Sequence, residues 1–483
     1  MKISASKITI LITAAFIFSL LTTNQAQAAP GDLDPSFGNG GKVFISGNTT
    51  PSRVRVQPDG KIMTFGDYPY DSWAFLARNN SNGTPDLSFS GGLVFLRQFD
   101  EENLIFIDFI TLPDGKYLIT GLKANNYALF RYNANGTPDT SFGTNGVQMD
   151  SFSGESIALQ TDGKVIIGGY NAIGGVYRYF LVRYNTDGTL DAGFGENGIV
   201  FPSQFYGKIV LQPDGKILVR ASDVQIARYN SNGSRDNTFR FTGIVGTGIS
   251  NVAGIGFQSD GKIIVGGTVS QTLSRIERYN DNGTLDTTFG TNGRADITDT
   301  SNNQYSLGII RSLVVQRNNK IVTAGSVNGI FAVYRFTSNG SLDATFGVNG
   351  LVTTQMTPIC RFFDITLQPD GKIVAVGDAG ETIQQVGLVR YLGDPVFANI
   401  NAEVSGRVMI LDGRGLRNAA VSLIDSQGDI RTAITSSFGF YRFDGVTTGE
   451  NYTISVSSKR YRFAPQSIQI ENALTNVDFV GLE

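Results

Sequence analysis

The chemistry open to this chain is limited by the reactive side chains it contains. Its 483 residues include no histidine and one cysteine, Cys360. Without histidine there is no serine–histidine–carboxylate triad, no cysteine–histidine pair and no histidine-based zinc site. Catalysis would depend on carboxylates, tyrosine, lysine or arginine. A glycosidase, for example, needs two carboxylates facing one pocket, about 5 to 9.5 Å apart. The acids outside the repeated phrases that could form such a pair are Asp67, Asp71, Asp100, Glu101 and Glu102.

Exposed aromatic side chains offer a second kind of chemistry, because their rings can stack on sugars or peptides. The aromatic candidates lie in segments that differ from unit to unit: Tyr68, Tyr70, Trp73, Tyr177, Tyr179, Phe205, Tyr206 and Tyr305. With Asp67, Asp71, Glu101 and Glu102, all of these aromatic residues except Phe205 form the predicted binding set. The same rings could instead pack loops together, and the sequence leaves both interpretations open.

Three sequence phrases recur along the chain between the segments that hold these candidate residues. The first, typified by "LQPDGKI", places lysines 46 to 58 residues apart, at Lys61, Lys116, Lys164, Lys216, Lys262, Lys320 and Lys372. The second is an alternating apolar run ending in arginine, such as "YFLVRYN", and the third is a turn of the form "NGTLDxxFGxNG". A period of this size is typical of a solenoid, propeller or array.

Each repeat predicts four short strands, since its apolar runs of four to six residues are bounded by glycine, aspartate or asparagine. Four antiparallel strands with two apolar faces must stack on neighbouring sheets, which favours propeller blades over an open solenoid. The last unit stops at "RYLGDP" without its "LDxxF" phrase, and the missing phrase stands at "GDLDPSFGNGGKV" near the other end. We therefore predict seven blades, closed by a strand near residues 42–45 that joins the strands of residues 364–391.

Each repeated arginine needs a carboxylate partner if it is partly buried, and the "LD" aspartate is the nearest candidate. This predicts structural pairs, which include Arg390 with Asp34, Arg78 with Asp86, Arg131 with Asp139 and Arg183 with Asp191. The turn "NTDGTLD", residues 185–191, resembles a calcium loop, but its copies replace the acid with asparagine. Calcium prefers six to eight oxygens, carboxylates among them. We expect a hydrogen-bonded turn here and no metal or other cofactor, with calcium as the alternative.

The phrases "LQPDGKI" and "RYNxDGTLDxxFGxNG" resemble the delta-60 repeat family over residues 31–392. That resemblance implies a β-propeller in an exported bacterial protein and supplies no catalytic residues. Unit six departs from the pattern at Asn318 and Asn319, where Asp-Gly is expected. Residues 396–483 lose the repeat and resemble the carboxypeptidase regulatory-like domain through "DGRGL", "AAVSLID", "TSSFGFYRF" and "GENYTISV". This implies a small non-catalytic β-sandwich.

The first 28 residues carry two lysines, an apolar run and Ala26-Gln27-Ala28, which is typical of a cleaved signal peptide. We predict a signal peptide over 1–28, a seven-bladed propeller over 29–395 and a sandwich over 396–483. The chain would then be secreted, to the medium or the cell surface, with no membrane insertion. With 39 basic and 42 acidic residues it lacks the excess positive charge of a general nucleic-acid binder.

These observations favour a non-enzymatic, monomeric protein that binds an extracellular polysaccharide or protein. The alternatives are a carboxylate- and tyrosine-based propeller enzyme, such as a glycoside hydrolase or lyase, and a structural component of the cell envelope. A pair of acids converging in a central pocket would favour the enzyme.

Overall fold

The computed structural model describes most of the chain after residue 27. The described residues are 28–45, 50–68, 73–96, 104–123, 126–149, 153–173, 176–205, 207–298, 310–357, 360–379, 385–394, 402–425, 430–447, 450–470 and 474–482.

In these ranges the repeats form seven antiparallel sheets of four strands, as many as there are arginine-ending phrases. We call them blades one to seven. The strands are, for blade one, β2 (Thr50–Val56), β3 (Ile62–Tyr68), β4 (Trp73–Asn79) and β5 (Leu93–Leu96); for blade two, β6 (Leu104–Thr111), β7 (Tyr117–Lys123), β8 (Asn126–Tyr132) and β9 (Val147–Met149); for blade three, β10 (Ser153–Leu159), β11 (Val165–Ile173), β12 (Val176–Tyr184) and β13 (Ile199–Val200); for blade four, β14 (Ile209–Leu211), β15 (Ile217–Ser222), β16 (Gln225–Tyr229) and β17 (Ile244–Gly246); for blade five, β18 (Asn251–Phe257), β19 (Ile263–Thr268), β20 (Leu273–Tyr279) and β21 (Arg294–Thr298); for blade six, β22 (Ser312–Val315), β23 (Ile321–Val327), β24 (Ile330–Phe336) and β25 (Leu351–Thr354); and for blade seven, β26 (Cys360–Leu367), β27 (Ile373–Ala379), β28 (Val386–Tyr391) and β1 (Lys42–Ile45). One short 3₁₀ turn, η1 (Ser90–Gly92), precedes β5.

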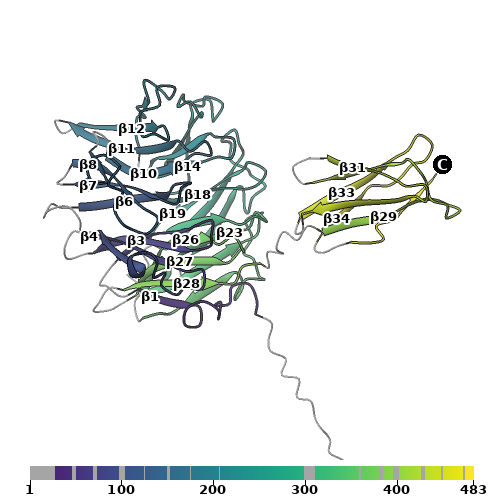
Figure 1. Cartoon of the computed structure of the whole chain (residues 1–483), viewed down its shortest axis with the longest axis horizontal. Helices are drawn as coiled ribbons and strands as arrows, with labels where there is room; N and C mark the ends of the chain where they lie inside the picture. The colour runs from purple at the N-terminus through teal and green to yellow at the C-terminus, as the bar shows by residue number, and fades with distance from the viewer. Residues whose placement is uncertain are drawn as a thin grey trace, which may run out of the picture.

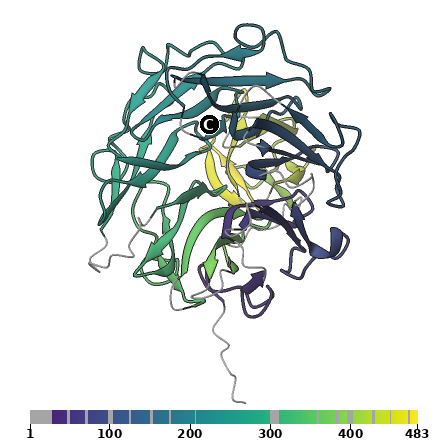
Figure 2. The same cartoon turned by 90° about the vertical axis from the view of Figure 1, so that its left-hand side faces the viewer.

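The blades are arranged around a common axis (Figures 1 and 2). The first strand of each blade contacts the first strand of a neighbour, as β2 does with β26 and β6 does with β10, so these strands form the inner wall of the ring. The all-β propeller prediction is confirmed. Because consecutive strands are antiparallel, the "PDGK" and "NGTLDxxF" turns lie on one face of the ring, and the variable connections lie on the other.

The N-terminal strand β1 completes the last blade. It pairs antiparallel with β28, with Lys42 opposite Val389 and Ile45 opposite Val386, and the two strands lie side by side in Figure 1. Backbone hydrogen bonds from Asp34 N to Arg390 O and from Arg390 N to Gly41 O extend the contact. The last blade is therefore built from both ends of the propeller sequence.

The core lies between blades, because each sheet presents apolar side chains to both neighbours. Blades one and two meet at Phe65 and Phe109, whose ring centres are 5.6 Å apart. Across the closing contact, Phe37 and Ile45 pack with Leu388 of blade seven and Val54 of blade one. Cys360 is buried in the same kind of contact between blades six and seven. Burial of apolar surface at every seam is the main force holding the ring.

Tight turns on the conserved face depend on left-handed backbone. Gly60 of the first "PDGK" turn has φ +81°, a region that glycine enters without steric cost. In unit six Asn319 takes the same role with φ +64°, so the departure from Asp-Gly leaves the turn intact.

The C-terminal segment forms two small sheets. Strands β29 (Ala402–Ile410), β32 (Phe440–Val446) and β35 (Phe479–Gly481) make one, with β29 parallel to β35. Strands β30 (Ala420–Ile424), β31 (Ile430–Ile434), β33 (Glu450–Ser457) and β34 (Gln466–Ile470) make the other. Alternate side chains, among them Val404, Val408, Val421 and Ile454, form the buried layer between them, as expected for a β-sandwich.

Candidate functional site

The repeated arginines, aspartates and phenylalanines form the turns of the blades. Nε of the arginine lies 2.7 to 2.8 Å from Oδ2 of the aspartate in Arg78–Asp86, Arg131–Asp139, Arg183–Asp191, Arg228–Asp236, Arg278–Asp286 and Arg335–Asp343. In blade seven Nη2 of Arg390 lies 2.9 Å from Asp34. The phenylalanine of each "LDxxF" phrase packs its ring on the same guanidinium, with 4.5 to 4.9 Å between Cζ and the ring centre. The sequence reasoning anticipated the aspartate and missed the ring.

The "PDGK" lysines reach the same aspartates. Lys116 Nζ lies 2.9 Å from Asp139, and Lys320 Nζ lies 3.1 Å from Asp343. Burial alone would raise the pKa of Asp343, but hydrogen bonds from Thr345 and Lys320 and the charge of Arg335 lower it to about 2. These charges neutralise one another inside the blade, so the repeated residues hold the turns of each blade together.

The calcium-like turn bonds to itself. Asp187 Oδ1 accepts hydrogen bonds from the backbone N and the hydroxyl of Thr189, and Asn185 Nδ2 donates to Thr189 Oγ1. The other copies repeat this pattern with asparagine, as at Asn82 and Thr84. No three His, Cys, Asp or Glu side chains within the described ranges lie close enough to hold a metal ion.

Much of the predicted binding set, together with Asp100 of the acid candidates, falls outside the side chains that the structure describes. Tyr70, Asp71, Asp100, Glu101, Glu102, Tyr206 and Tyr305 lie outside the described residues, and the backbone alone is described for Asp67, Tyr68, Trp73 and Tyr177. Tyr179 is half-buried and packs edge-on against Tyr170, its partner across β11 and β12. The prediction that Phe205 is exposed was wrong. Its side chain is 1% exposed and packs between blades three and four, where it fills the space above Gly168.

The structure instead brings together a ring of seven residues on the inner wall of the channel, six of which have polar side chains. The residue eight positions before the "PDGK" lysine occupies the same place on each inner strand. These residues are Arg53, Asp108, Ser156, Lys208, Gly254, Ser312 and Asp364. Sequence reasoning missed them because it compared what the repeats share, whereas this position changes from blade to blade.

The two aspartates of this ring tie neighbouring blades together. Asp364 accepts hydrogen bonds from Ser312 Oγ at 2.8 Å, Arg55 Nη1 at 2.9 Å and the backbone N of Val54 at 3.1 Å. Asp108 accepts from the backbone N of Ile157 at 3.2 Å and lies 3.5 Å from Arg55 Nη2. Both carboxylates are thus engaged by blades on either side.

Lys208 is, with Arg53, one of the two positively charged residues of the ring, and its surroundings shift its pKa. Its Nζ lies 3.4 Å from the carbonyl oxygen of Ala253 in the next blade. Burial lowers the pKa of this amine to about 8, against the opposing attraction of Asp364 and Asp108. Glu155, on the neighbouring inner strand, has its pKa raised by burial, and the charge of Arg220 opposes that shift.

A cavity of about 450 Å³ opens beside this ring toward the face of the variable connections. Residues from blades one, four, five, six and seven line it, which places it across the channel rather than between two blades. Three guanidinium groups face it, those of Arg53, Arg220 and Arg311, together with the amide of Asn251 and the ring of Phe363. We call this cavity the channel pocket.

The guanidinium groups of the channel pocket differ in how they are held. Arg220 Nη2 lies 3.0 Å from Asn251 Oδ1 and also pairs with Asp223. Arg311 lies over the ring of Phe363, with 5.6 Å from Cζ to the ring centre. Arg53 is 3.8 Å from Asp108 and about one third exposed. None of the described residues lining the channel pocket is a carboxylate.

Six segments of the chain match the family described as "Domain of unknown function (DUF5122) beta-propeller". They are residues 112–142, 160–194, 212–239, 258–289, 316–346 and 368–394. The chain carries DUF5122 propeller repeats. Residues 403–480 match the carboxypeptidase regulatory-like domain. Both resemblances expected from the sequence are therefore confirmed. Blade one of this DUF5122 propeller lies outside the matched segments, yet it shares the strand pairing and the Arg78–Asp86 contact of the others.

Several solved structures are similar to the DUF5122 propeller in fold. Regucalcin from Agrobacterium tumefaciens is 13% identical, with 60% of this chain and 91% of that chain covered and a TM-score of 0.33. Aldose sugar dehydrogenase with bound PQQ from Streptomyces coelicolor is 15% identical, with 59% of this chain and 94% of that chain covered and a TM-score of 0.36. BamB from Moraxella catarrhalis is 12% identical, with 75% of this chain and 92% of that chain covered and a TM-score of 0.36. No curated protein matches the chain in sequence. Identities this low carry no functional information about the DUF5122 propeller. Within the part that the structure describes, no helix is long and apolar enough to cross a bilayer.

Proposed function

We propose that this chain is an exported, non-enzymatic binding protein whose channel pocket holds an acidic polysaccharide outside the cell. The observation that carries the proposal is the convergence of Arg53, Arg220 and Arg311, from three different blades, on one cavity without a lining carboxylate. Guanidinium groups bind carboxylates in a forked, two-bond geometry that point charges do not provide.

The remaining lining suits a sugar chain. Asn251 offers an amide beside Arg220, and Phe363 offers a ring face beside Arg311. An aromatic ring stacks on the apolar side of a sugar, while the arginines bind its acid groups. A volume of about 450 Å³ lies in the usual range for ligand sites, roughly 300 to 1,000 Å³.

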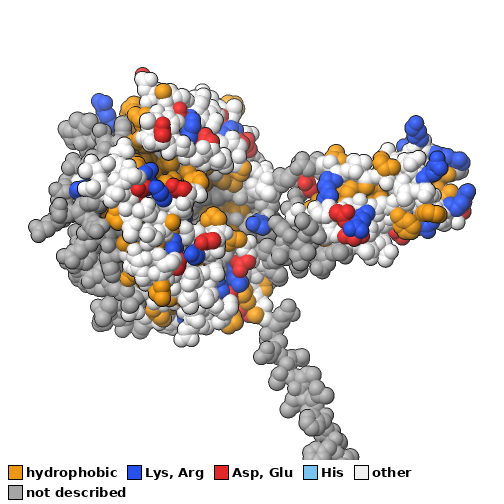
Figure 3. Space-filling view, viewed as in Figure 1, with side chains coloured by type: hydrophobic (Ala, Val, Ile, Leu, Met, Phe, Trp, Pro, Cys, Tyr) orange, Lys and Arg blue, Asp and Glu red, His pale blue; other side chains and the backbone are white. Residues whose placement is uncertain are grey.

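The enzyme alternative has less support at this pocket. A glycosidase needs an acid pair at the substrate, whereas Asp108 and Asp364 are held by arginine, serine and backbone groups below the cavity. General nucleic-acid binding is also disfavoured, since acidic and basic side chains are interspersed on the propeller surface in Figure 3. Nucleic-acid binders concentrate positive charge on one face.

Export is supported by the signal-like residues 1–28. Mass spectrometry of the N-terminus of protein collected from the culture medium and from the cell surface would test this. We expect a chain that begins at Ala29. A chain retained in the cytoplasm with its first 28 residues intact would contradict export.

The binding proposal is tested by calorimetry with oligogalacturonate and with a neutral galactan fragment of equal length. We expect only the acidic chain to bind. Arg311→Gln and Arg53→Gln should each weaken binding roughly 10- to 100-fold, because hydrogen bonds to charged groups contribute about 1.5 to 3 kcal/mol. Arg414→Gln is the matched control, since this arginine is largely exposed in the sandwich.

Two results would contradict the proposal. Equal affinity for the neutral chain would show that the arginines do not select the ligand. Shortening of the oligogalacturonate during incubation, lost on replacing an acid rather than an arginine, would establish the enzyme alternative instead.

A further inference from the structure

A second site is indicated by the way that neighbouring blades are joined on the conserved face. Within the described residues, six of the seven repeated arginines make a polar contact to the turn of the following blade. The acceptors are the backbone carbonyls of Ala134, Ser231, Ser338 and Ser81, which receive Arg78, Arg183, Arg278 and Arg390, and the carboxylates of Asp281 and Asp394, which receive Arg228 and Arg335. An oxygen from the next blade therefore completes each of these six sites.

Arg131 of blade two is the exception. Its Nε binds Asp139 at 2.7 Å and its Nη2 lies 3.3 Å from Ser141, both in its own blade. No described residue accepts a hydrogen bond from its Nη1. Its side chain is 24% exposed, whereas the other six arginines are at most 9% exposed.

A difference at one repeated position of the sequence accompanies this exposure of Arg131. Four residues before each "PDGK" lysine stands a glutamine, except in blade two, where Leu112 takes its place. In blades three, four, five and seven this glutamine accepts a hydrogen bond from Nη1 of the arginine at 3.0 to 3.5 Å. Leu112 cannot accept one, so Arg131 lacks this acceptor in addition to lacking a contact with the neighbouring turn.

Blade three also leaves space at this seam. The residue after its "PDGK"-type lysine is Val165, whereas the other blades have isoleucine or tyrosine there. The apolar side chains around it are correspondingly less buried. Leu118 and Leu129 are 8% and 5% exposed, while their equivalents in the other blades, such as Ile166 and Leu181, are at 0%.

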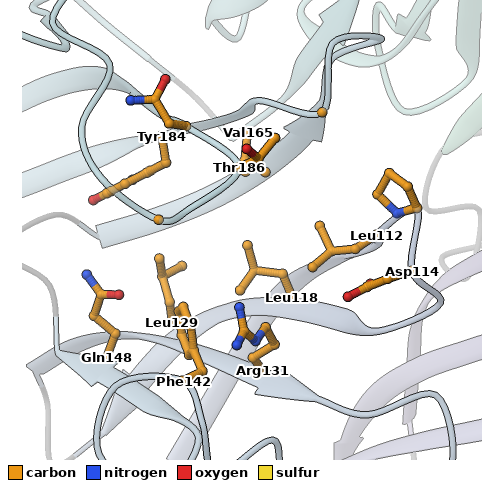
Figure 4. Close-up of a pocket in the computed structure, with 14 residues that line it drawn as sticks. Leu112, Asp114, Leu118, Leu129, Arg131, Phe142, Gln148, Val165, Tyr184 and Thr186 are labelled. Carbon is orange, nitrogen blue, oxygen red and sulfur yellow. The ribbon is translucent and has the colours of Figure 1, made fainter.

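The result is a cavity of about 300 Å³ between blades two and three, which we call the seam pocket. Figure 4 shows Leu112, Leu118 and Leu129 along one side, Val165 and Tyr184 opposite them, and the Arg131 guanidinium among the leucines of its own blade. Its volume lies at the lower end of the range for ligand sites. The pocket lies on the conserved face and is separate from the channel pocket.

The seam pocket is apolar over most of its surface, with a few polar groups. Besides Arg131 these include Asp114, whose Oδ1 already accepts from the backbone N of Lys116, and Gln148, Asn185 and Thr186 at the edge. Arg131 is the charged donor of the lining, and no described residue accepts a hydrogen bond from its Nη1. In the other blades the matching Nη1 donates to a carbonyl in four cases and to the Asp281 carboxylate in one, while Arg335 reaches the Asp394 carboxylate through Nη2, so either kind of oxygen fits.

We propose that the seam pocket binds a small acyl compound, with its apolar chain between Leu118, Leu129 and Val165 and its carbonyl or carboxylate oxygen accepting a hydrogen bond from Arg131 Nη1. Such a ligand supplies the oxygen that glutamine and the next turn supply elsewhere. It also covers apolar surface that this seam leaves open.

The test uses three eight-carbon probes with the full chain: octanamide, octanoate and octylammonium, followed by calorimetry or ligand-detected NMR. The first two carry the acceptor in neutral and charged form, and the third carries the same chain without an acceptor. We expect octanamide, octanoate or both to bind with a dissociation constant on the order of 1 mM or below. Octylammonium should bind at least about tenfold more weakly. Preference between the first two identifies the ligand as a free acid or as an amide-like or ester-like acyl group.

Variants separate the seam pocket from non-specific binding. Leu112→Gln restores the residue found in the other blades, so it should fold and weaken binding at least about tenfold. Gln160→Leu makes the reverse change at the next seam and should leave probe binding to the seam pocket unaltered. Arg131→Gln should abolish the preference for acyl probes over octylammonium. Binding of octylammonium equal to that of octanoate and octanamide, binding unaffected by Leu112→Gln, or no binding by any probe would each overturn the proposal.

Discussion

Removing the N-terminal closing segment should destabilise the propeller far more than removing the C-terminal sandwich. The perturbation is a chain that starts at residue 46, compared with chains that span residues 29–483 and 29–395. The shortened chain lacks β1, the fully buried Phe37 and the Asp34 partner of Arg390.

The size of the effect can be worked from these contacts. Burial of a phenylalanine side chain contributes about 1.5 to 3 kcal/mol. Leaving the buried Arg390 without Asp34 costs about 3 to 5 kcal/mol, because the guanidinium stays desolvated without a partner. The total, roughly 5 to 8 kcal/mol, is comparable with the whole stability of many proteins, about 5 to 15 kcal/mol.

The assay is urea unfolding followed by far-UV circular dichroism, with limited proteolysis as a second readout. The chain that starts at 46 should unfold at a much lower urea concentration, while the chain that ends at 395 should keep the propeller transition. Asp34→Asn tests the same contact more gently. Asp32→Asn is its matched control, since Asp32 is exposed in the same segment. Equal effects of the two truncations would refute closure by β1, as would equal effects of the two substitutions.

Four further predictions concern three charged side chains and the buried cysteine. The pKa of Asp343 is about 2 in the fold and 3.8 ordinarily, so its contribution to stability is present above about pH 4 and is lost as the pH falls toward 2. In Asp343→Asn the thermal unfolding midpoint should therefore depend less on pH over that range. Lys208 binds its proton less tightly in the fold, with a pKa of about 8 against 10.5, so Lys208→Met should stabilise the protein below pH 8, by on the order of 2 kcal/mol, and the gain should shrink between pH 8 and 10.5 in urea titrations. Glu277 is fully buried and bonded to Tyr279 and Arg294, so Glu277→Ala should cost about 3 to 5 kcal/mol in urea unfolding and Glu277→Gln clearly less. Cys360 is buried, so a thiol reagent should label it only after denaturation, and rapid labelling of the native protein would contradict its placement.

The sequence was sufficient to predict the architecture, because every repeat carries the same strand and turn patterns. Each "PDGK" turn and each arginine-ending strand is a local signal, and the incomplete unit containing Arg390 pointed to its partner Asp34. The exposure of Phe205 was predicted wrongly because the residue lies in a segment without strand pairing, where the sequence pattern does not indicate which way a side chain points. Its burial depends on Gly168, which leaves room for the ring.

The two pockets depend on contacts between blades that the repeat pattern does not predict. Arg53 of blade one and Asp364 of blade seven occupy equivalent positions, but their two strands are neighbours only once the ring is closed. Leu112 is visible in the sequence as a departure from glutamine. Its effect on Arg131 depends on the neighbouring blade, which local patterns do not place. Both sites arise where a repeated position varies, whereas the comparison of units emphasised what stays constant.

The pairing of β1 with β28 also sets an order of events during synthesis. Ribosomes add roughly 5 to 20 residues per second, and Val389, opposite Lys42, follows about 350 residues later. For on the order of 20 to 70 seconds β1 is therefore made but has no partner. Any factor that holds nascent chains has this interval in which to bind the segment, and the last blade forms only after that segment is released.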